Sequence, residues 1–322
     1  MKVKVGDIPY GLAYDSGKGE IFVSNAGSNS VSIISDAEDK VIGTVPVGIA
    51  PHGMAYDQAK GQIFVANLGS NNVSVISDES NDVVAEIPVG LGPHDVAYDS
   101  ARGHLFVANE KSGTVSVISD STDSVVATIP VGSYPFDIAY DQMAGKVFVT
   151  STNSTVSVIS DSTDSVVATI PVGSYPFDIA YDQMAGKVFV TSTNSTVSVI
   201  SDSTDSVVAT IPVGLYPYYI SSGPEGEMLV SRYNSGVITA VSGDEYRVVA
   251  TIPVGKSPFG IAYDVGRDRI FATMHNSDTV SMVPYPSSNV PEFGPLTILG
   301  ISLSFVGLII ISKSGRIQDH IW

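Results

Sequence analysis

Hydrophobic and polar residues alternate in short runs along most of the chain, and these runs return at a fixed spacing. One unit contains "FDIAYD" (136–141), "KVFVT" (146–150), "TVSVISD" (155–161) and "SVVATIPVG" (165–173). Val, Ile, Phe, Tyr and Thr dominate the runs, and the turn formers "QMAG", "STNS" and "DSTD" separate them. The pattern predicts four short antiparallel strands per unit, and the repeats show no helical periodicity.

A glycine that follows Pro-Val or its equivalent marks the repeat. It stands at Gly6, Gly48, Gly90, Gly132, Gly173, Gly214 and Gly255, so the spacing is 42 residues three times and then 41 residues three times. One segment is copied unchanged, because residues 114–173 reappear as 155–214. Seven units of four strands predict an all-β, seven-bladed β-propeller.

The ends of the repeat array predict how the ring closes. After Gly255 the last unit supplies three strands, "FGIAYD", "RIFAT" and "TVSMVPY", and then runs into "PSSNVPEFG". At the N-terminus, "MKVKVG" aligns with the fourth strand of the other units. We therefore expect residues 2–6 to complete blade seven, and closure to protect the near-identical sheets from pairing with one another.

The units resemble a known family. "IFVSNAGSNSVSIISDAEDKVIGTVPVG" and "IFVANLGSNNVSVISDESNDVVAEIPVG" are similar to the YVTN β-propeller repeats of archaeal surface-layer-type and bacterial periplasmic proteins. The likeness covers residues 1–285, although the tetrapeptide reads F-V-S-N, F-V-A-N or F-V-T-S here. It implies the propeller fold, and it says little about chemistry because the family is functionally mixed.

The C-terminal region predicts a membrane anchor. Twenty uncharged residues, "FGPLTILGISLSFVGLIIIS" (293–312), precede Lys313 and Arg316, and this length suits a helix that crosses a bilayer. The preceding "VPEFG" resembles the P-E-F-G segment before C-terminal anchors of archaeal surface proteins. We expect a propeller (1–285), a linker (286–295), a transmembrane helix (296–312) and a short cytoplasmic tail (313–322). The competing interpretation is an extra strand pair or a buried helix.

Localisation depends on the N-terminus. "MKVKVGDIPYG" has no apolar central stretch and already matches the end of a repeat, so we identify no signal peptide in this sequence. An exported propeller needs one. Either the true start lies upstream of Met1, or the protein is a tail-anchored cytosolic propeller, and we favour the first, with the propeller extracellular.

Composition excludes several classes of function. The net charge is -17, and the sixteen Lys and Arg are scattered, so no basic stripe predicts a nucleic-acid partner. Without cysteine there are no disulfides, thiolate ligands or Cys nucleophile. His52, His94 and His275 lack metal-ligand spacing, and no catalytic motif is present. We therefore expect no cofactor, no metal and no assigned catalytic residue.

One ring of positions suggests a site. The residue after the turn proline is aromatic or imidazole in every unit: Tyr10, His52, His94, Phe136, Phe177, Tyr218 and Phe259. First strands line the central channel of a propeller, so these side chains should crowd its mouth, either as a hydrophobic plug or as a ligand platform. Asp95, Asp137 and Asp178 follow three of them and could attract a cation, although carboxylates beside turns are more often solvated or capping.

Blade six and three sequons complete the candidates. Blade six diverges at Tyr218, Tyr219, Arg232 and Tyr233, which could form a local recognition group. Candidate glycosylation sites occur at Asn72, Asn153 and Asn194, which we place in turns between second and third strands. Asp141 and Asp182 should cap the turns after their strands.

These patterns predict a membrane-anchored, cell-surface propeller that acts as a binding or envelope-structural module, with a surface protein or glycan as its ligand. The alternative is a propeller enzyme of the lyase or lactonase type with a metal-assisted site at His52 and His94. Identical blades argue against an enzyme, because a catalytic constellation needs different residues in defined places.

Overall fold

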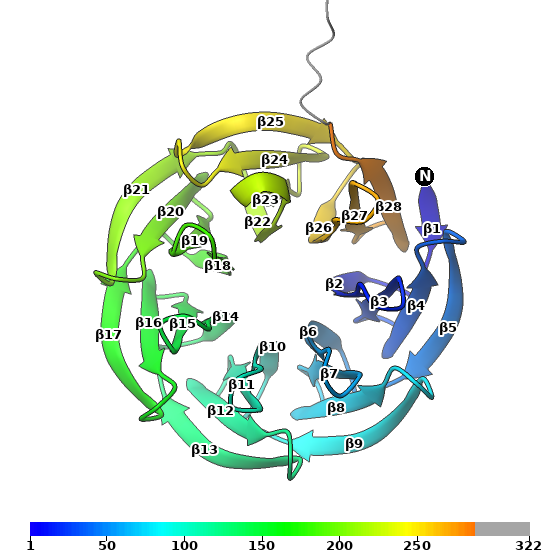
Figure 1. Cartoon of the computed structure of the whole chain (residues 1–322), viewed down its shortest axis with the longest axis horizontal. Coiled ribbons are helices and arrows are strands. Elements are labelled where there is room, and N and C mark those ends of the chain that lie inside the picture. The colour runs from blue at the N-terminus through cyan, green and yellow to red at the C-terminus, as the bar shows by residue number, and fades with distance from the viewer. Residues whose placement is uncertain (287–322) are drawn as a thin grey trace, which may run out of the picture. The chain divides into compact units, whose positions relative to one another are not determined.

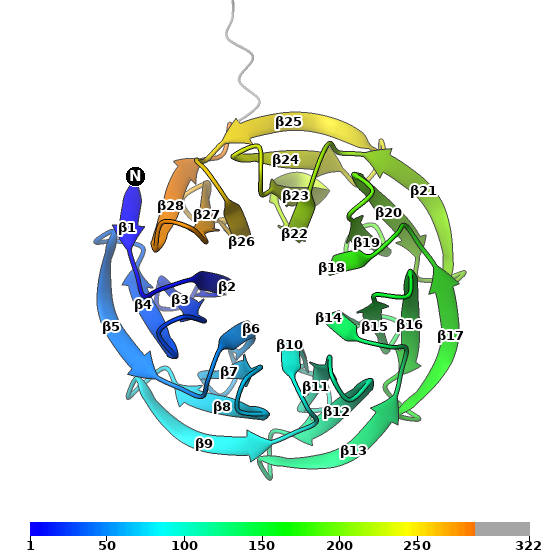
Figure 2. The same cartoon turned by 180° about the vertical axis from the view of Figure 1, so that it is seen from behind.

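The computed structural model describes residues 1–286 and shows seven four-stranded antiparallel sheets arranged in a ring around a central axis (Figures 1 and 2). The prediction of an all-β, seven-bladed propeller is confirmed for this part of the chain. Within it, no helix is long and apolar enough to cross a membrane. The anchor predicted at 296–312 lies outside the described residues.

Strands are counted from the axis outward in each blade. The first strands are β2 (Pro9–Asp15), β6 (Pro51–Asp57), β10 (Pro93–Asp99), β14 (Pro135–Asp141), β18 (Pro176–Asp182), β22 (Pro217–Ser222) and β26 (Pro258–Asp264). The second strands are β3 (Glu20–Asn25), β7 (Gln62–Asn67), β11 (His104–Asn109), β15 (Lys146–Ser151), β19 (Lys187–Ser192), β23 (Glu227–Arg232) and β27 (Arg269–Met274). The third strands are β4 (Ser30–Ser35), β8 (Asn72–Ser77), β12 (Thr114–Ser119), β16 (Thr155–Ser160), β20 (Thr196–Ser201), β24 (Val237–Ser242) and β28 (Thr279–Pro284). The fourth strands are β5 (Lys40–Pro46), β9 (Asp82–Pro88), β13 (Ser124–Pro130), β17 (Ser165–Pro171), β21 (Ser206–Pro212), β25 (Arg247–Pro253) and β1 (Lys2–Lys4), and a short 3-10 turn, η1 (Pro224–Gly226), follows β22.

The N-terminal strand closes the ring as predicted. β1 pairs with β28 in antiparallel register, with Lys2 opposite Ser281 and Lys4 opposite Thr279. The backbone of Met1 and Met282 adds hydrogen bonds in both directions. The paired strand ends at Lys4 rather than at Gly6, so it is shorter than the other fourth strands.

Apolar clusters between neighbouring blades hold the ring together. One cluster joins Phe64 and Val75 of blade two to Leu105 and Val107 of blade three, and each of the four is fully buried. Six second strands place a fully buried phenylalanine at the same position: Phe22, Phe64, Phe106, Phe148, Phe189 and Phe271. Each such side chain contributes about 1.5–3 kcal/mol by its burial. Blade six has Leu229 instead.

The turns of each blade divide between two faces of the ring. The proline face carries the turns that lead into the proline of each first strand and the turns that join second to third strands. The acidic face carries the turns that join first to second strands and third to fourth strands. Tyr285, directly after β28, lies on the acidic face, because its N donates to Asp268 O in the turn between β26 and β27. The first and third strands of each blade run toward the acidic face, so the end of a third strand lies on it.

Polar side chains on the acidic face form a repeated network. Asp141 caps the turn after β14, because its Oδ1 accepts hydrogen bonds from Met143 N and Ala144 N, as predicted. The Tyr140 hydroxyl donates to Asp161 Oδ2 at 3.0 Å. The equivalent cap and Tyr-Asp bond recur around the ring, so these aspartates stabilise the blades.

Candidate binding site at the channel mouth

The seven residues that follow the turn prolines form a closed circle on the proline face. A bulge after each turn proline, such as that between Pro135 and Ile138, interrupts the pairing of the first strand where it begins. Consecutive ring centroids around the circle lie between 3.7 Å (His94 to Phe136) and 5.6 Å (Tyr218 to Phe259) apart. Phe177 and Phe259, which are two blades apart, lie 6.0 Å from each other. The aromatic residues therefore pack against one another as a plug.

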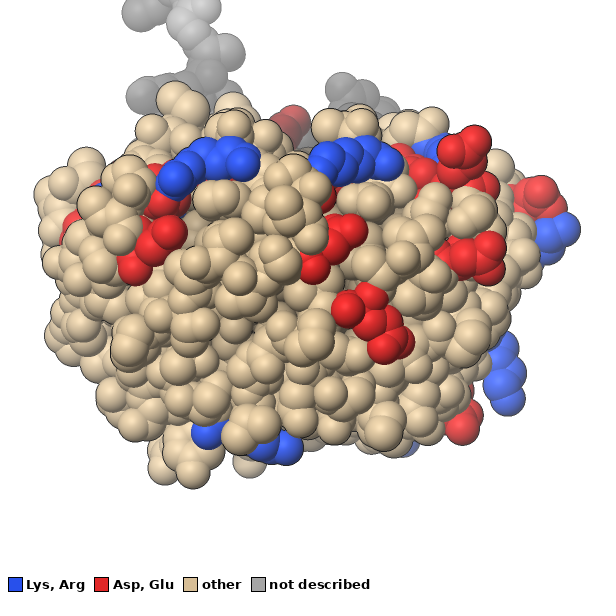
Figure 3. All heavy atoms as spheres, turned by 90° about the horizontal axis from the view of Figure 1, so that it is seen from below, with Lys and Arg blue, Asp and Glu red and all other residues tan. Residues whose placement is uncertain are grey.

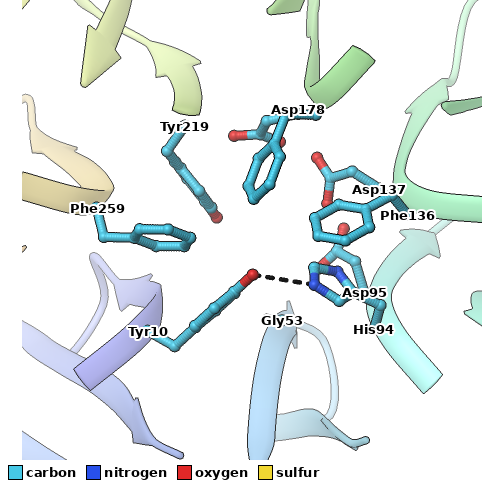
Figure 4. A pocket seen from close by; sticks show the side chains of 10 residues that line it. Tyr10, Gly53, His94, Asp95, Phe136, Asp137, Asp178, Tyr219 and Phe259 are labelled. Carbon is cyan, nitrogen blue, oxygen red and sulfur yellow. Dashed lines mark hydrogen bonds between the residues drawn. The ribbon is translucent and has the colours of Figure 1, made fainter. Parts of the chain in front are cut away.

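The cavity associated with the plug is small. Tyr10, Asp95, Asp178 and Tyr219 are among the side chains that line it, and Figure 4 shows them directed toward one another around the axis. The volume of this cavity is only about 10 Å³. That volume suits one water molecule, so a larger ligand would have to bind above the plug.

Three carboxylates at the axis join neighbouring blades. Asp137 Oδ2 accepts a hydrogen bond from Ile179 N at 2.9 Å, and Asp178 Oδ2 accepts one from Ile220 N at 2.5 Å. Asp95 occupies the equivalent position, and the backbone N–H of Ile138 in the next blade lowers its pKa. Asp137 and Asp178 are buried, so the interpretation that these groups are solvated is wrong for both, because the next blade supplies their hydrogen-bond donors.

Burial dominates the electrostatics of these carboxylates. Desolvation raises the pKa of Asp95 to about 7, although its backbone hydrogen bonds act in the opposite direction. Desolvation likewise raises the pKa of Asp178 well above its usual range, and the charge of Asp95 adds to the effect. A glycine faces Asp95 from blade two, because a Cβ on Gly53 would lie 1.7 Å from Asp95 Oδ1.

The histidines of the plug are held as packing groups. His94 is buried, and its Nε2 lies 2.9 Å from the Tyr10 hydroxyl (Figure 4). Burial lowers the pKa of both His94 and His52, and the two rings lie 5.0 Å apart. Within residues 1–286, no group of three His, Asp or Glu side chains could hold a metal ion. The residues present therefore do not fit a metal centre at His52 and His94.

The structure divides the candidate group of blade six. Tyr218 and Tyr233 contact each other, with centroids 5.3 Å apart, and both approach Phe259 of the plug. The Arg232 guanidinium lies over Gly214, where a Cβ would be 2.4 Å from it. Tyr219 instead lines the axial cavity, where burial and the charge of Asp178 raise the pKa of its hydroxyl. Tyr219 therefore belongs to the axial cavity rather than to one surface group with the other three.

The three sequons differ in their surroundings. Asn153 and Asn194 are exposed in turns on the proline face, as expected. Asn72 does not lie in a turn, because it begins β8, and its Nδ2 donates to Glu86 at 3.2 Å. Its amide is therefore partly engaged within the blade.

A rim of exposed apolar side chains surrounds the plug, and the sequence patterns above did not single it out. Its members lie in the turns just before the first-strand prolines: Ile8, Ile49, Leu91, Tyr134, Tyr175, Leu215 and Tyr216. The residue directly before each proline has a left-handed backbone, with φ of 52° at Tyr134 and 47° at Tyr175. The position of these residues in the repeat could have identified them, because strand parity places them beside the plug.

The two faces also differ in charge. Each of the first six blades places at least two acidic residues in the turn between third and fourth strands, for example Asp161 and Asp164. The turns of the proline face contain few charged residues, namely Asp7, Glu110, Lys111, Lys256 and Asp278. In the edge-on view of Figure 3, most charged atoms lie toward one rim of the ring. The proline face is therefore nearly neutral, whereas the acidic face is strongly negative.

Comparison with known proteins supports the fold. No protein-family model matches the chain, and no curated protein matches it in sequence. The chain is similar in structure to hydrazine synthase of Kuenenia stuttgartiensis, with a TM-score of 0.78 and 19% identity. The likeness covers 87% of this chain and 96% of that one. At this identity it shows the propeller fold alone.

Proposed function

We propose that the chain is a membrane-anchored β-propeller of the cell surface that acts as a binding or envelope-structural module through its proline face. The observation that carries the proposal is the apolar rim around the plug, where Tyr175 and Leu215 are 64% and 65% exposed. A nearly neutral surface with exposed apolar and aromatic side chains is typical of a surface that binds another molecule.

The direction of the chain supports an outward proline face. β28 ends on the acidic face, and in the sequence the linker (286–295) begins directly after Tyr285. Ten residues reach at most about 36 Å, so an anchor at 296–312 would keep the acidic face toward the membrane. The YVTN-type repeats and the P-E-F-G segment favour an archaeal surface protein. The proline face, with the plug, Asn153 and Asn194, is then directed away from the cell.

Two single cysteines at opposite ends of β13 test the orientation. Ser133→Cys lies on the proline face and Asp123→Cys on the acidic face, and both positions are exposed. The chain has no other cysteine. On intact cells a bulky maleimide should label position 133 strongly and position 123 weakly. The reverse result would overturn the orientation, and labelling of both positions only after lysis would place the propeller in the cytoplasm.

The second candidate is a propeller enzyme of the lyase or lactonase type. Its support is the set of shifted pKa values of His94 and Asp95, because such shifts often accompany catalysis. The small cavity and the poor fit to a metal ion weaken it. Metal analysis of the purified chain, together with activity of a His52→Ala, His94→Ala double variant, would distinguish the two functions.

A further inference from the structure

Tyr134 and Tyr175 are two copies of one exposed aromatic group. Each lies directly before a first-strand proline, and their exposed fractions are 56% and 64%. A left-handed backbone is unfavourable for a bulky residue, and a following proline disfavours it further. Blade three has Gly92 at this position with φ of 64°. Blade six has Tyr216, with φ of 56° and 47% exposed, but it follows Leu215 where blades four and five have serine. Each ring is exposed, so its burial does not offset the backbone strain. The contribution of each ring is therefore expected from contacts outside the chain.

Both tyrosines sit on a braced pair of turns. Thr152 N donates to Tyr134 O at 3.4 Å, and Thr193 N donates to Tyr175 O at 3.3 Å. The Thr193 hydroxyl also donates to Ser174 O at 3.1 Å. These bonds fix the turn that carries each ring to the neighbouring turn of the same blade. The rings are therefore presented on a preorganised support, which lowers the entropic cost of binding.

The groups beside each ring are uncharged. Ser133 and Asn153 are exposed next to Tyr134, and Ser174 and Asn194 are exposed next to Tyr175. Asn153 Oδ1 accepts a hydrogen bond from Thr155, which leaves its Nδ2 as the half of the amide that can donate to a ligand. The four turns involved, 131–134, 152–154, 172–175 and 193–195, contain no charged residue. Aromatic rings with hydroxyl and amide groups suit a neutral, hydroxyl-rich ligand better than an anion or a cation.

We propose that Tyr134 and Tyr175 form a two-site platform that binds a neutral polysaccharide of repeating sugar units. The apolar C–H face of a sugar ring can lie on each tyrosine, while Ser and Asn side chains bond its hydroxyl groups. Because residues 114–173 and 155–214 are identical, the two sites select the same chemical unit, and a ligand that occupies both must present that unit twice. Linking the two contacts in one polymer raises the overall affinity well above that of either site. This inference rests on the proposal that the proline face is the binding face.

Affinity electrophoresis of the full-length chain through gels with mannan or hydroxyethyl cellulose tests the platform. The buffer contains a detergent without a sugar headgroup. At least one of these polymers should retard the wild type. The double variant Tyr134→Gly, Tyr175→Gly should bind at least tenfold more weakly. The two single variants should lose affinity equally, within a factor of two, because the sites are identical.

A matched control uses the same two blades on the opposite face. Met143 and Met184 are also copies of each other and are 75% and 87% exposed on the acidic face. The double variant Met143→Gly, Met184→Gly should keep wild-type retardation. The tyrosine double variant should melt at the wild-type temperature or higher, because glycine removes the left-handed strain. A lower melting temperature would show that the tyrosines support the fold, and would overturn the platform.

Other outcomes identify a different occupant. If neither polymer retards the wild type, the polysaccharide inference fails, whereas the outward orientation is decided separately by the cysteine labels. Tyrosine-dependent binding to phosphatidylcholine vesicles would show a membrane surface instead. Tyrosine-dependent dimerisation in sedimentation experiments would show a second copy of the chain. Either result would overturn the polysaccharide inference.

Discussion

The two faces of the ring are built from the ends of the same strands. Repeated side chains on the acidic face form hydrogen bonds within the molecule, whereas repeated side chains on the rim of the proline face are exposed to solvent. On the acidic face, repeated residues form hydrogen bonds within their own blade: Asp141 accepts one from Met143 N, and the Tyr140 hydroxyl donates one to Asp161. On the rim of the proline face, Tyr134 and Tyr175 repeat as faithfully but remain exposed. A repeated residue with internal partners builds the blade. A repeated residue with a left-handed backbone and an exposed ring instead supports the binding proposal made for this face.

On the proline face, the residues of the plug pack against one another, whereas the residues of the rim are exposed. Truncation of a plug residue should have the largest effect on stability. Phe177 contacts Phe136 and Tyr218 at centroid distances of 4.4 and 4.6 Å. Phe177→Ala should lower the free energy of unfolding by about 3 kcal/mol in urea titrations, because it leaves a gap in the plug. Tyr175→Gly, two positions earlier, should cost nothing. Equal losses of unfolding free energy in the two variants would show that the plug and the rim contribute equally to stability, which contradicts the distinction between them.

The axial carboxylates should give the next largest effect, and it depends on pH. The folded-state pKa of Asp95 is about 7, above the ordinary value of 3.8, so the folded protein holds a proton that the unfolded chain has lost. Stability is therefore lost as the pH rises from about 4 to 7. Burial lowers the pKa of His94, which costs stability as the pH falls below 6.5 and opposes this trend.

Asp95→Asn isolates the carboxylate from the histidine. The variant lacks the ionisation cost, so its stability relative to the wild type should be about 2–3 kcal/mol greater at pH 8 than at pH 5. Urea titrations at both pH values measure the difference. Asp123→Asn on the acidic face, which is exposed in a turn, should show no such change. A pH-independent difference for Asp95→Asn would show that Asp95 is ionised throughout.

The sequence predicts the fold well because period and alternation are properties of the chain itself. The expected strands of blade four, 136–141 and 146–150, differ from the observed β14 and β15 by one residue at one end each.

The candidate site was harder to predict. The role of Asp137 was not evident from the sequence, because its partner, Ile179 N, belongs to the next blade and lies 42 residues away. Tyr134 was missed because turn chemistry explains its proline and glycine neighbours but not an exposed aromatic ring. The turn residues of blade six, around η1, have lost the repeat pattern.

Ion pairs on the acidic face should have the smallest effect, and they test whether that face stabilises the ring by its charges at all. Lys60 Nζ lies 3.0 Å from Asp120 Oδ1 and also donates to Asp120 O, with the lysine side chain 39% exposed. The Asp120 side chain is only 8% exposed, but the lysine remains accessible to water and salt, so the pair contributes about 0–1 kcal/mol. Lys60→Gln removes the pair and leaves Asp120 with the Tyr98 hydroxyl as a donor at 3.0 Å. It also adds net negative charge to a face that already has an excess of it. We expect a loss of about 0.5 kcal/mol in 10 mM NaCl that becomes undetectable in 0.5 M NaCl.

The wild type should itself become more stable with added salt, because screening weakens repulsion among the many acidic residues more than it weakens the few pairs. A wild type that is destabilised by salt would mean that ion pairs, rather than the Tyr-Asp bonds and the packed blades, support the acidic face.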